Sequence, residues 1–153
     1  MNNILSYKGF ELQIYLQGVA GNKIYNYTRI GLENMSAAYN QLAGTAHRWT
    51  GEGTSNSMPR AVWADPNQNA RVSDRWVEDG SYLRLKNISL SYTFPDRWIR
   101  AMRLDALKLT FSCENVATAT KYKGLDPEVG VNGIDYSSFP SSRTFNIGLN
   151  INF

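Results

Sequence analysis

Residues 143–153 read RTFNIGLNINF and end the chain. Apolar side chains occupy every second position from Phe145 to Phe153, and polar or small residues stand between them. This alternation with period two predicts a β-strand that has one apolar and one polar face. A strand of about 9–11 such residues crosses a membrane when its apolar face meets lipid and its polar face meets the lumen of a barrel. The stretch therefore favours a transmembrane β-barrel, and an antiparallel edge strand of a soluble protein is the alternative.

The composition excludes several other classes of protein. The net charge is only +3 and no basic run is present, so a nucleic-acid partner is not expected. The mean hydropathy is −0.40 and no run of 18 apolar residues occurs, which excludes a transmembrane helix but not barrel strands. Cys113 is the only cysteine, so no intrachain disulfide can form. Residues 1–20 lack the pattern of a signal peptide, and a barrel chain without one is expected to be the C-terminal piece of a longer protein.

Alternating segments elsewhere predict an all-β, antiparallel fold. We expect strands near 9–19, 80–94, 103–115 and 142–153, and residues 2–6 resemble the tail of one more strand. The even-numbered residues of the first strand and the odd-numbered residues of the last should face outward. In 80–94 the alternation inverts, because Leu83 and Leu85 fall on the polar side of the later part. We interpret this inversion as the part of a long strand that extends beyond the membrane.

The connections between these strands alternate in length. Residues 7–9 and 95–102 form short connections, whereas residues 21–78 and 116–141 form long ones. Outer-membrane barrels have short periplasmic turns and long extracellular loops, so the two long segments should be extracellular loops on the same side of the sheet. A loop as long as 21–78 is also unusual in a compact soluble domain.

Apolar residues at helical spacing occur inside the first long segment. They predict a short amphipathic helix over 33–43, formed around Met35, Ala38, Tyr39 and Leu42.

Several motifs carry a family resemblance. The most specific is DGSYLRLKNISLSY at residues 79–92, which is followed by GLDPEV at 124–129. Further matches are GFEL at 9–12, LQG at 16–18, RWT at 48–50, PRA at 59–61, SDR at 73–75, GIDY at 133–136, Pro140 and RTF at 143–145. Over essentially the whole chain, these motifs resemble the C-terminal end of a SusC/RagA-type TonB-linked outer-membrane transporter of Bacteroidetes-type bacteria.

The resemblance implies a large plugged barrel of the roughly 22-stranded class in the bacterial outer membrane. It implies import of glycans or peptides, energised by the TonB complex, under a lid formed by a SusD-like surface lipoprotein. Residues 1–153 would contribute about four to five terminal strands and two long extracellular loops of that antiparallel transmembrane β-barrel. The plug, the TonB-contacting motif and the other strands are missing, so the fragment should not transport by itself.

Two groups of residues are candidate sites. Asn146, Gly148, Ile151 and Phe153 resemble the signal by which the barrel assembly machinery recognises and inserts outer-membrane barrels. Four aromatic residues in the long segments are candidates for contact with a ligand or with the lid, although packing within the loops is the alternative: Trp49, Trp63, Trp76 and Tyr136. Tyr92 and Phe94, together with Phe153, fit the aromatic girdle at the interface with outer-membrane lipid.

Catalytic chemistry is not indicated. His47 is the only histidine, so the usual zinc ligand sets cannot be assembled. The segment 65–69 resembles the start of a calcium loop, but Ala70 replaces the glycine of the sixth position and Trp76 the glutamate of the twelfth. An Asx-rich turn is the simpler interpretation. We expect no metal, no cofactor and no enzymatic activity.

Two other functions remain open from the sequence. A siderophore-type receptor would share the TonB mechanism, but the run at 79–92 argues against it. A soluble secreted β-sandwich that binds carbohydrate would explain the alternation and the tryptophans. It would not explain the apolar end at Phe153 or the alternating loop lengths.

Overall fold

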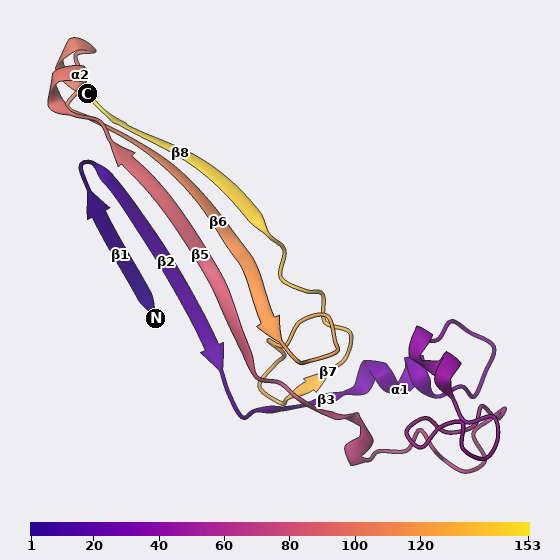
Figure 1. Ribbon diagram of the computed structural model, residues 1–153. Helices are drawn as coiled ribbons and strands as arrows, with labels where there is room; N and C mark the ends of the chain where they lie inside the picture. The colour runs from indigo at the N-terminus through magenta and orange to yellow at the C-terminus, as the bar shows by residue number, and fades with distance from the viewer. The chain divides into compact units, whose positions relative to one another are not determined.

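The computed structural model describes all residues, 1–153, and these form two compact units (Figure 1). The sheet unit comprises Met1–Ala20, Ser81–Lys121 and Pro140–Phe153, and the loop unit comprises Gly21–Gly80 and Tyr122–Phe139. None of the helices has both the length and the apolar character needed to span a membrane.

The sheet unit is a five-stranded antiparallel sheet with the order β1-β2-β5-β6-β8 (Figure 1). Its strands are β1 (Asn2–Tyr7), β2 (Phe10–Val19), β5 (Tyr82–Thr93), β6 (Ala106–Thr120) and β8 (Thr144–Asn152). All the strands predicted from alternation are confirmed, and β6 continues beyond its predicted end to Thr120. A tight turn at Lys8 and Gly9, both with positive φ, joins β1 to β2, and the helix α2 (Asp96–Ala101) lies between β5 and β6.

One face of the sheet is apolar across all five strands. The register aligns rows of residues from strand to strand, and two neighbouring rows are Leu5–Leu12–Leu90–Phe111–Ile147 and Tyr7–Phe10–Tyr92–Leu109–Leu149. The even-numbered residues of β2 and the odd-numbered residues of β8 therefore share one face, as predicted. No layer covers this face along β8, where Phe145 is 64% and Ile147 is 78% exposed.

The inverted alternation near Leu83 and Leu85 has a different cause from the predicted one. Tyr15 pairs with Asn87 but Leu16 pairs with Leu85, so the register of β2 skips Lys86. This extra residue in β5 is a β-bulge, and it returns Leu85 to the face that Leu16 occupies. The interpretation of a strand that changes its surroundings is wrong, because the apolar face continues through the bulge.

Both long connections leave the same end of the sheet. Tyr82, at the start of β5, pairs with Val19 at the end of β2 and with Thr120 at the end of β6. The β1–β2 turn and α2 lie at the other end, where Thr93 donates its backbone N–H to the Gly9 carbonyl oxygen at 2.8 Å. The predicted alternation of short and long connections is thus confirmed at the level of strand topology.

The loop unit joins the two long connections through a small three-stranded sheet with the order β4-β3-β7. Its elements are β3 (Lys23–Asn26), α1 (Tyr27–Glu33), the 3₁₀ helices η1 (Ala43–His47) and η2 (Asp74–Trp76), β4 (Val77–Asp79) and β7 (Ile134–Asp135). Strand β3 pairs with β4 antiparallel and with β7 parallel, so residues of the second long connection complete a sheet begun in the first.

The predicted helix over 33–43 is wrong. The observed helix α1 ends at Glu33, and Met35 adopts φ +51°, a left-handed conformation that cannot continue a right-handed helix. At the other end, the Asn26 side chain accepts a hydrogen bond from the Arg29 backbone N–H at 3.1 Å and caps the first turn.

Candidate functional site

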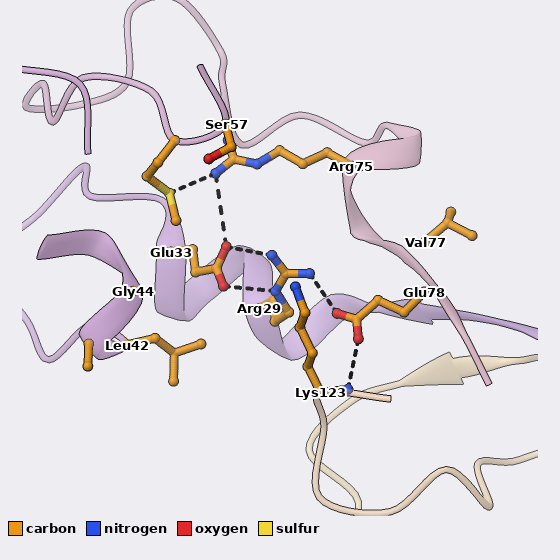
Figure 2. Close-up of a pocket in the computed structure, with 11 residues that line it drawn as sticks. Arg29, Glu33, Leu42, Gly44, Ser57, Arg75, Val77, Glu78 and Lys123 are labelled. Carbon is orange, nitrogen blue, oxygen red and sulfur yellow. Dashed lines mark hydrogen bonds and ion pairs between the residues drawn. The ribbon is translucent and has the colours of Figure 1, made fainter. Parts of the chain in front are cut away.

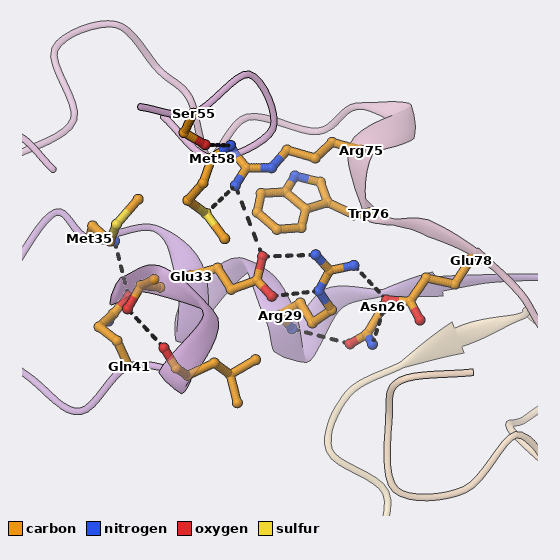
Figure 3. A network of polar contacts seen from close by, with 12 residues as sticks. Asn26, Arg29, Glu33, Met35, Gln41, Ser55, Met58, Arg75, Trp76 and Glu78 are labelled. Carbon is orange, nitrogen blue, oxygen red and sulfur yellow. Dashed lines mark hydrogen bonds and ion pairs between the residues drawn. The ribbon is translucent and has the colours of Figure 1, made fainter. Parts of the chain in front are cut away.

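A buried charge cluster is the centre of the loop unit (Figure 3). The Arg29 guanidinium donates from Nε and Nη2 to the two carboxylate oxygens of Glu33, both at 2.8 Å, and from Nη1 to Glu78 Oε1 at 2.6 Å. The side chains of Arg29, Glu33 and Glu78 are only 14%, 8% and 9% exposed. The hydrogen bonds to Glu33 raise the Arg29 pKa above its usual value, against the opposing effect of burial. Arg29 is therefore a permanent cation that two buried carboxylates share.

Local structure places the three charges together. Arg29 and Glu33 are four residues apart and lie on one face of α1. Glu78 comes from β4, which pairs with the strand that leads into α1, so that Ile24 lies opposite Glu78. Asn26 also connects β4 with α1, because its Nδ2 donates to Glu78 Oε1 at 3.2 Å while its Oδ1 caps α1.

Trp76 packs between two guanidinium groups (Figure 3). The ring lies 5.6 Å from the Arg29 Cζ and 4.6 Å from the Arg75 Cζ, and its Nε1 donates to the Arg71 carbonyl oxygen at 3.1 Å. Burial lowers the Arg75 pKa, although Glu33 Oε2 lies 4.0 Å from its Nη2. Trp76 is fully buried, so it serves packing and is not accessible to a ligand, against its candidate role from the sequence.

A second buried pair, Tyr122 and Asp135, lies within the second long connection. The Tyr122 hydroxyl donates to Asp135 Oδ2 at 2.6 Å, and Asp135 Oδ1 accepts the backbone N–H groups of Ser137 and Ser138. Burial and the hydrogen bond to Asp135 raise the Tyr122 pKa well above its usual value. The Lys123 backbone N–H also donates to Glu78 Oε2 at 2.9 Å, which links this pair to the charge cluster.

A pocket of about 690 Å³ opens beside the charge cluster (Figure 2). Its walls combine basic, acidic and apolar residues from both long connections: Arg29, Glu33, Leu42, Ala43, Gly44, Ser57, Met58, Arg75, Val77, Glu78 and Lys123. Both carboxylates already accept hydrogen bonds from Arg29. No group of three or more His, Cys, Asp or Glu residues is arranged to hold a metal ion. The pocket offers both charged and apolar surface to a ligand.

The aromatic candidates from the sequence do not gather at this pocket. Trp63 and Tyr136 are exposed at 72% and 60%, and the Tyr136 ring lies 5.1 Å from that of Tyr27. Trp49 lines a separate hollow of about 300 Å³ with Pro59 and Arg60. These three residues stay candidates for ligand or lid contact, each at its own place on the unit.

The terminal candidates lie on β8 or directly after it. Asn146 and Gly148 are on the polar face, opposite Ser112 and Thr110, and Ile151 lies opposite Leu107 on the apolar face. Phe153 follows the strand and is 90% exposed. Their role in insertion stays a prediction.

The calcium-like segment forms a turn. Asp65 uses its two carboxylate oxygens to accept the backbone N–H groups of Asn69 and Ala70, both at 2.9 Å. The Asp65 side chain thus closes a turn through residues four and five positions further on, rather than the two of an Asx-turn.

Sequence reasoning missed the charge cluster and the Tyr122–Asp135 pair. One local indication was present, because Asn26 is a good N-cap and Arg29 and Glu33 have the spacing of a helical ion pair. Nothing local indicated Glu78, which is 49 residues from Arg29 in the sequence.

No family model matches the chain, but curated proteins with similar sequences are TonB-dependent receptors. TonB-dependent receptor P3 of Formosa agariphila is 36% identical over 163 residues, a match that covers 99% of this chain and 16% of that receptor. TonB-dependent receptor SusC of Bacteroides thetaiotaomicron is 29% identical over 151 residues, which covers 97% of this chain and 14% of SusC. The chain thus spans only a small part of the receptors that it matches.

Solved structures agree with the sequence matches. The structure of the RagAB peptide transporter contains a chain that superposes with a TM-score of 0.83 at 26% identity, over 97% of this chain and 16% of that one. The RagAB peptide importer in its open-open state gives a TM-score of 0.84 with the same coverage. In sequence and in fold, the chain therefore matches one part of the SusC/RagA-type TonB-dependent receptors.

Proposed function

We propose that this chain is the C-terminal barrel portion of a TonB-dependent importer in the bacterial outer membrane. The observation that carries the proposal is the apolar face that continues across all five strands and is left exposed by the rest of the chain. Lipid is the surrounding that such a face requires, since an exposed contiguous apolar surface is unfavourable in water. The opposite face, with residues such as Gln13, Ser89 and Asn146, would line the lumen.

The strand topology supports one orientation. Because both long connections leave the same end of the sheet, 21–78 and 116–141 would be extracellular loops, and the β1–β2 turn and α2 would face the periplasm. The sheet ends in two open edges, β1 and β8, which require further strands in the complete barrel. By itself the segment would not transport.

The substrate is an oligosaccharide or a peptide in this proposal. The RagAB relative is named as a peptide transporter. A SusD-like surface lipoprotein and the TonB complex would be partners of the complete receptor. Trp49, Trp63 and Tyr136 would contact the ligand or the lid, because their rings are accessible on the loop unit. Asn146, Gly148, Ile151 and Phe153 would be recognised by the barrel assembly machinery.

The soluble carbohydrate-binding sandwich has little support. A sandwich buries the apolar face of one sheet under a second sheet, about 10 Å away. Leu149 and Phe111, on the face in question, are 61% and 48% exposed instead.

Accessible cysteines test the orientation. In the complete receptor, with other cysteines replaced and Cys113→Ala as background, Ser57→Cys and Ala101→Cys place single thiols at exposed sites in the loop unit and in α2. A membrane-impermeant maleimide should label position 57 on intact cells and position 101 only after the outer membrane is permeabilised. Labelling of position 101 on intact cells would contradict the orientation. Recovery of the receptor in the soluble fraction would contradict the membrane proposal itself.

A further inference from the structure

Three exposed arginines gather at the short-connection end of the sheet unit. Arg97 and Arg100 belong to α2, and Arg103 is in the turn that follows. None of the three forms an ion pair with the neighbouring Asp96 or Asp105. Lys8, in the β1–β2 turn, is another exposed cation at this end. The end of the sheet therefore has an excess of positive charge.

The helix that carries these arginines is fixed to the sheet. Ile99 is only 4% exposed, and its carbonyl oxygen accepts the Leu104 backbone N–H at 3.1 Å. The Asp105 backbone N–H then donates to the carbonyl oxygen of Asn152, at the end of β8, at 2.8 Å. The arginines consequently have a defined position beside the strand ends.

A chain of aromatic rings connects α2 with the apolar face. The Phe10 and Tyr92 rings, both on that face, are 4.5 Å apart between centroids. Phe94 lies 5.0 Å from Tyr92 and 6.0 Å from Trp98, which is 46% exposed. The Arg97 guanidinium lies 5.7 Å from the Trp98 ring. Trp98 thus marks the border of the apolar face, with arginine immediately next to it.

We propose that α2 and the turn after it bind the phosphate groups of anionic phospholipids. The inference rests on the proposed function, which places the apolar face in lipid and α2 at the periplasmic side. Tryptophan prefers the interface between hydrocarbon and headgroups, so Trp98 would set the depth of the helix. Arg97, Arg100 and Arg103 would then lie at the level of the phosphates, to which a guanidinium can donate two parallel hydrogen bonds. The occupant is a phospholipid of the periplasmic leaflet, such as phosphatidylglycerol.

Lipid retention by the complete receptor tests the proposal. The purified receptor is mixed with micelles that contain equal amounts of dioleoylphosphatidylglycerol and dioleoylphosphatidylethanolamine, and bound lipid is counted by native mass spectrometry. The wild type should prefer phosphatidylglycerol. In the triple variant Arg97→Gln, Arg100→Gln, Arg103→Gln, the ratio of bound phosphatidylglycerol to bound phosphatidylethanolamine should fall about tenfold, because each cation near the phosphates contributes to binding. The corresponding triple variant with lysines should keep most of it.

A matched variant controls for net charge. Arg48→Gln, Arg60→Gln, Arg71→Gln removes the same charge from exposed positions of the loop unit and should retain phosphatidylglycerol as the wild type does. Equal retention of phosphatidylglycerol by the two triple glutamine variants would overturn the inference. Displacement of bound phosphatidylglycerol by purified lipopolysaccharide would also overturn it. Heat-modifiability of each receptor in outer membranes is measured in parallel. A receptor that inserts but shows no effect of the α2 arginines refutes only this inference, whereas a wild type that does not insert refutes the proposed function.

Discussion

The sheet unit and the loop unit differ in how they cover their apolar side chains. In the sheet unit, apolar residues such as Ile147 are exposed, whereas Arg84 is 3% exposed and donates from Nε to Thr118 Oγ1 at 2.8 Å. In the loop unit, Ile24 and Trp76 are fully buried. The two units are therefore suited to different solvents, since the sheet unit leaves one continuous apolar face uncovered and the loop unit encloses a small apolar core.

The units also differ in what stabilises them. The sheet unit is ordered by the backbone ladder of five adjoining strands, in which each inner strand is hydrogen-bonded on both sides. The loop unit has short elements, and buried polar contacts around Arg29 and Asp135 order each of its two chain segments. The Lys123 backbone N–H on Glu78 and the pairing of β3 with β7 connect the two segments. Single substitutions should therefore act on one unit and leave the other unchanged.

The largest expected loss of stability follows from a substitution in the loop unit. Arg29→Met leaves Glu33 and Glu78 buried without their cation, which typically costs about 3–5 kcal/mol. Amide hydrogen exchange of the complete receptor should become faster in α1 and β4 and stay unchanged in β5 and β6. Arg60→Met, at an exposed position, is the control and should alter neither unit. Unchanged protection of α1 in the Arg29 variant would show that the cluster does not stabilise the unit.

A pair of adjacent substitutions tests the two faces of the sheet unit. Leu109→Lys puts a cation on the apolar face, where the cost at the centre of a bilayer is roughly 2–4 kcal/mol. Lys108→Leu removes only an exposed ion pair with Glu11 at 3.4 Å, which contributes about 0–1 kcal/mol. Heat-modifiability in outer membranes should show less folded receptor for Leu109→Lys than for Lys108→Leu. Equal amounts, or the reverse order, would mean that the faces are assigned wrongly.

A smaller effect is expected from the Tyr122–Asp135 pair. Tyr122→Phe removes the donor to a buried carboxylate oxygen, with a loss of about 1–3 kcal/mol. The pair also predicts a pH dependence, because the Tyr122 pKa is raised in the folded state above the usual value of about 10. As the pH rises above about 10, the unfolded chain releases this proton and the folded one keeps it, so the stability of the loop unit should fall.

Hydrogen exchange of the loop unit between neutral and alkaline pH measures this dependence. The loss of protection above pH 10 should be weaker in Tyr122→Phe than in the wild type. The exposed Tyr136, changed to phenylalanine, serves as the control and should behave as the wild type. An identical alkaline loss in Tyr122→Phe and the wild type would assign the effect to other groups.

The smallest effect on the folded state is expected at the end of β8. Deletion of Phe153 removes an exposed ring outside the strand, so receptors that insert should bind substrate with nearly unchanged affinity. Their number in the outer membrane should fall, because the terminal residues are proposed to act in assembly. Surface abundance is measured alongside the affinity per inserted receptor, with Phe139→Ala as a control at another exposed phenylalanine. Normal abundance with lost affinity would instead make this end a binding element.

The strands could be predicted from the sequence because their pattern is local. Each residue of a strand alternates with its neighbours, so apolar and polar faces are encoded in stretches such as 143–153 without knowledge of any partner. The positions of all the main strands, the short turn at Lys8 and Gly9 and the common origin of the long connections followed from this pattern. The motifs at 79–92 and 124–129 added the family.

The bulge at Lys86 shows where a local pattern becomes misleading. The alternation in β5 inverts at this residue, and the sequence by itself suggested a change of surroundings. Only the pairing with β2 shows that one residue is skipped and that Leu83 and Leu85 stay on the apolar face. Register is a property of two strands, so one strand cannot reveal it.

The loop unit depended on tertiary structure for most of its organisation. By itself, the sequence determined two long polar connections and the residues available in them, but it placed the helix at 33–43 instead of 27–33 and left Trp76 as a ligand candidate. Glu78 meets Arg29 across 49 residues and the Lys123 backbone across 45. Contacts between such distant residues have no sequence period, because they form only when the chain closes on itself and buries the charges together.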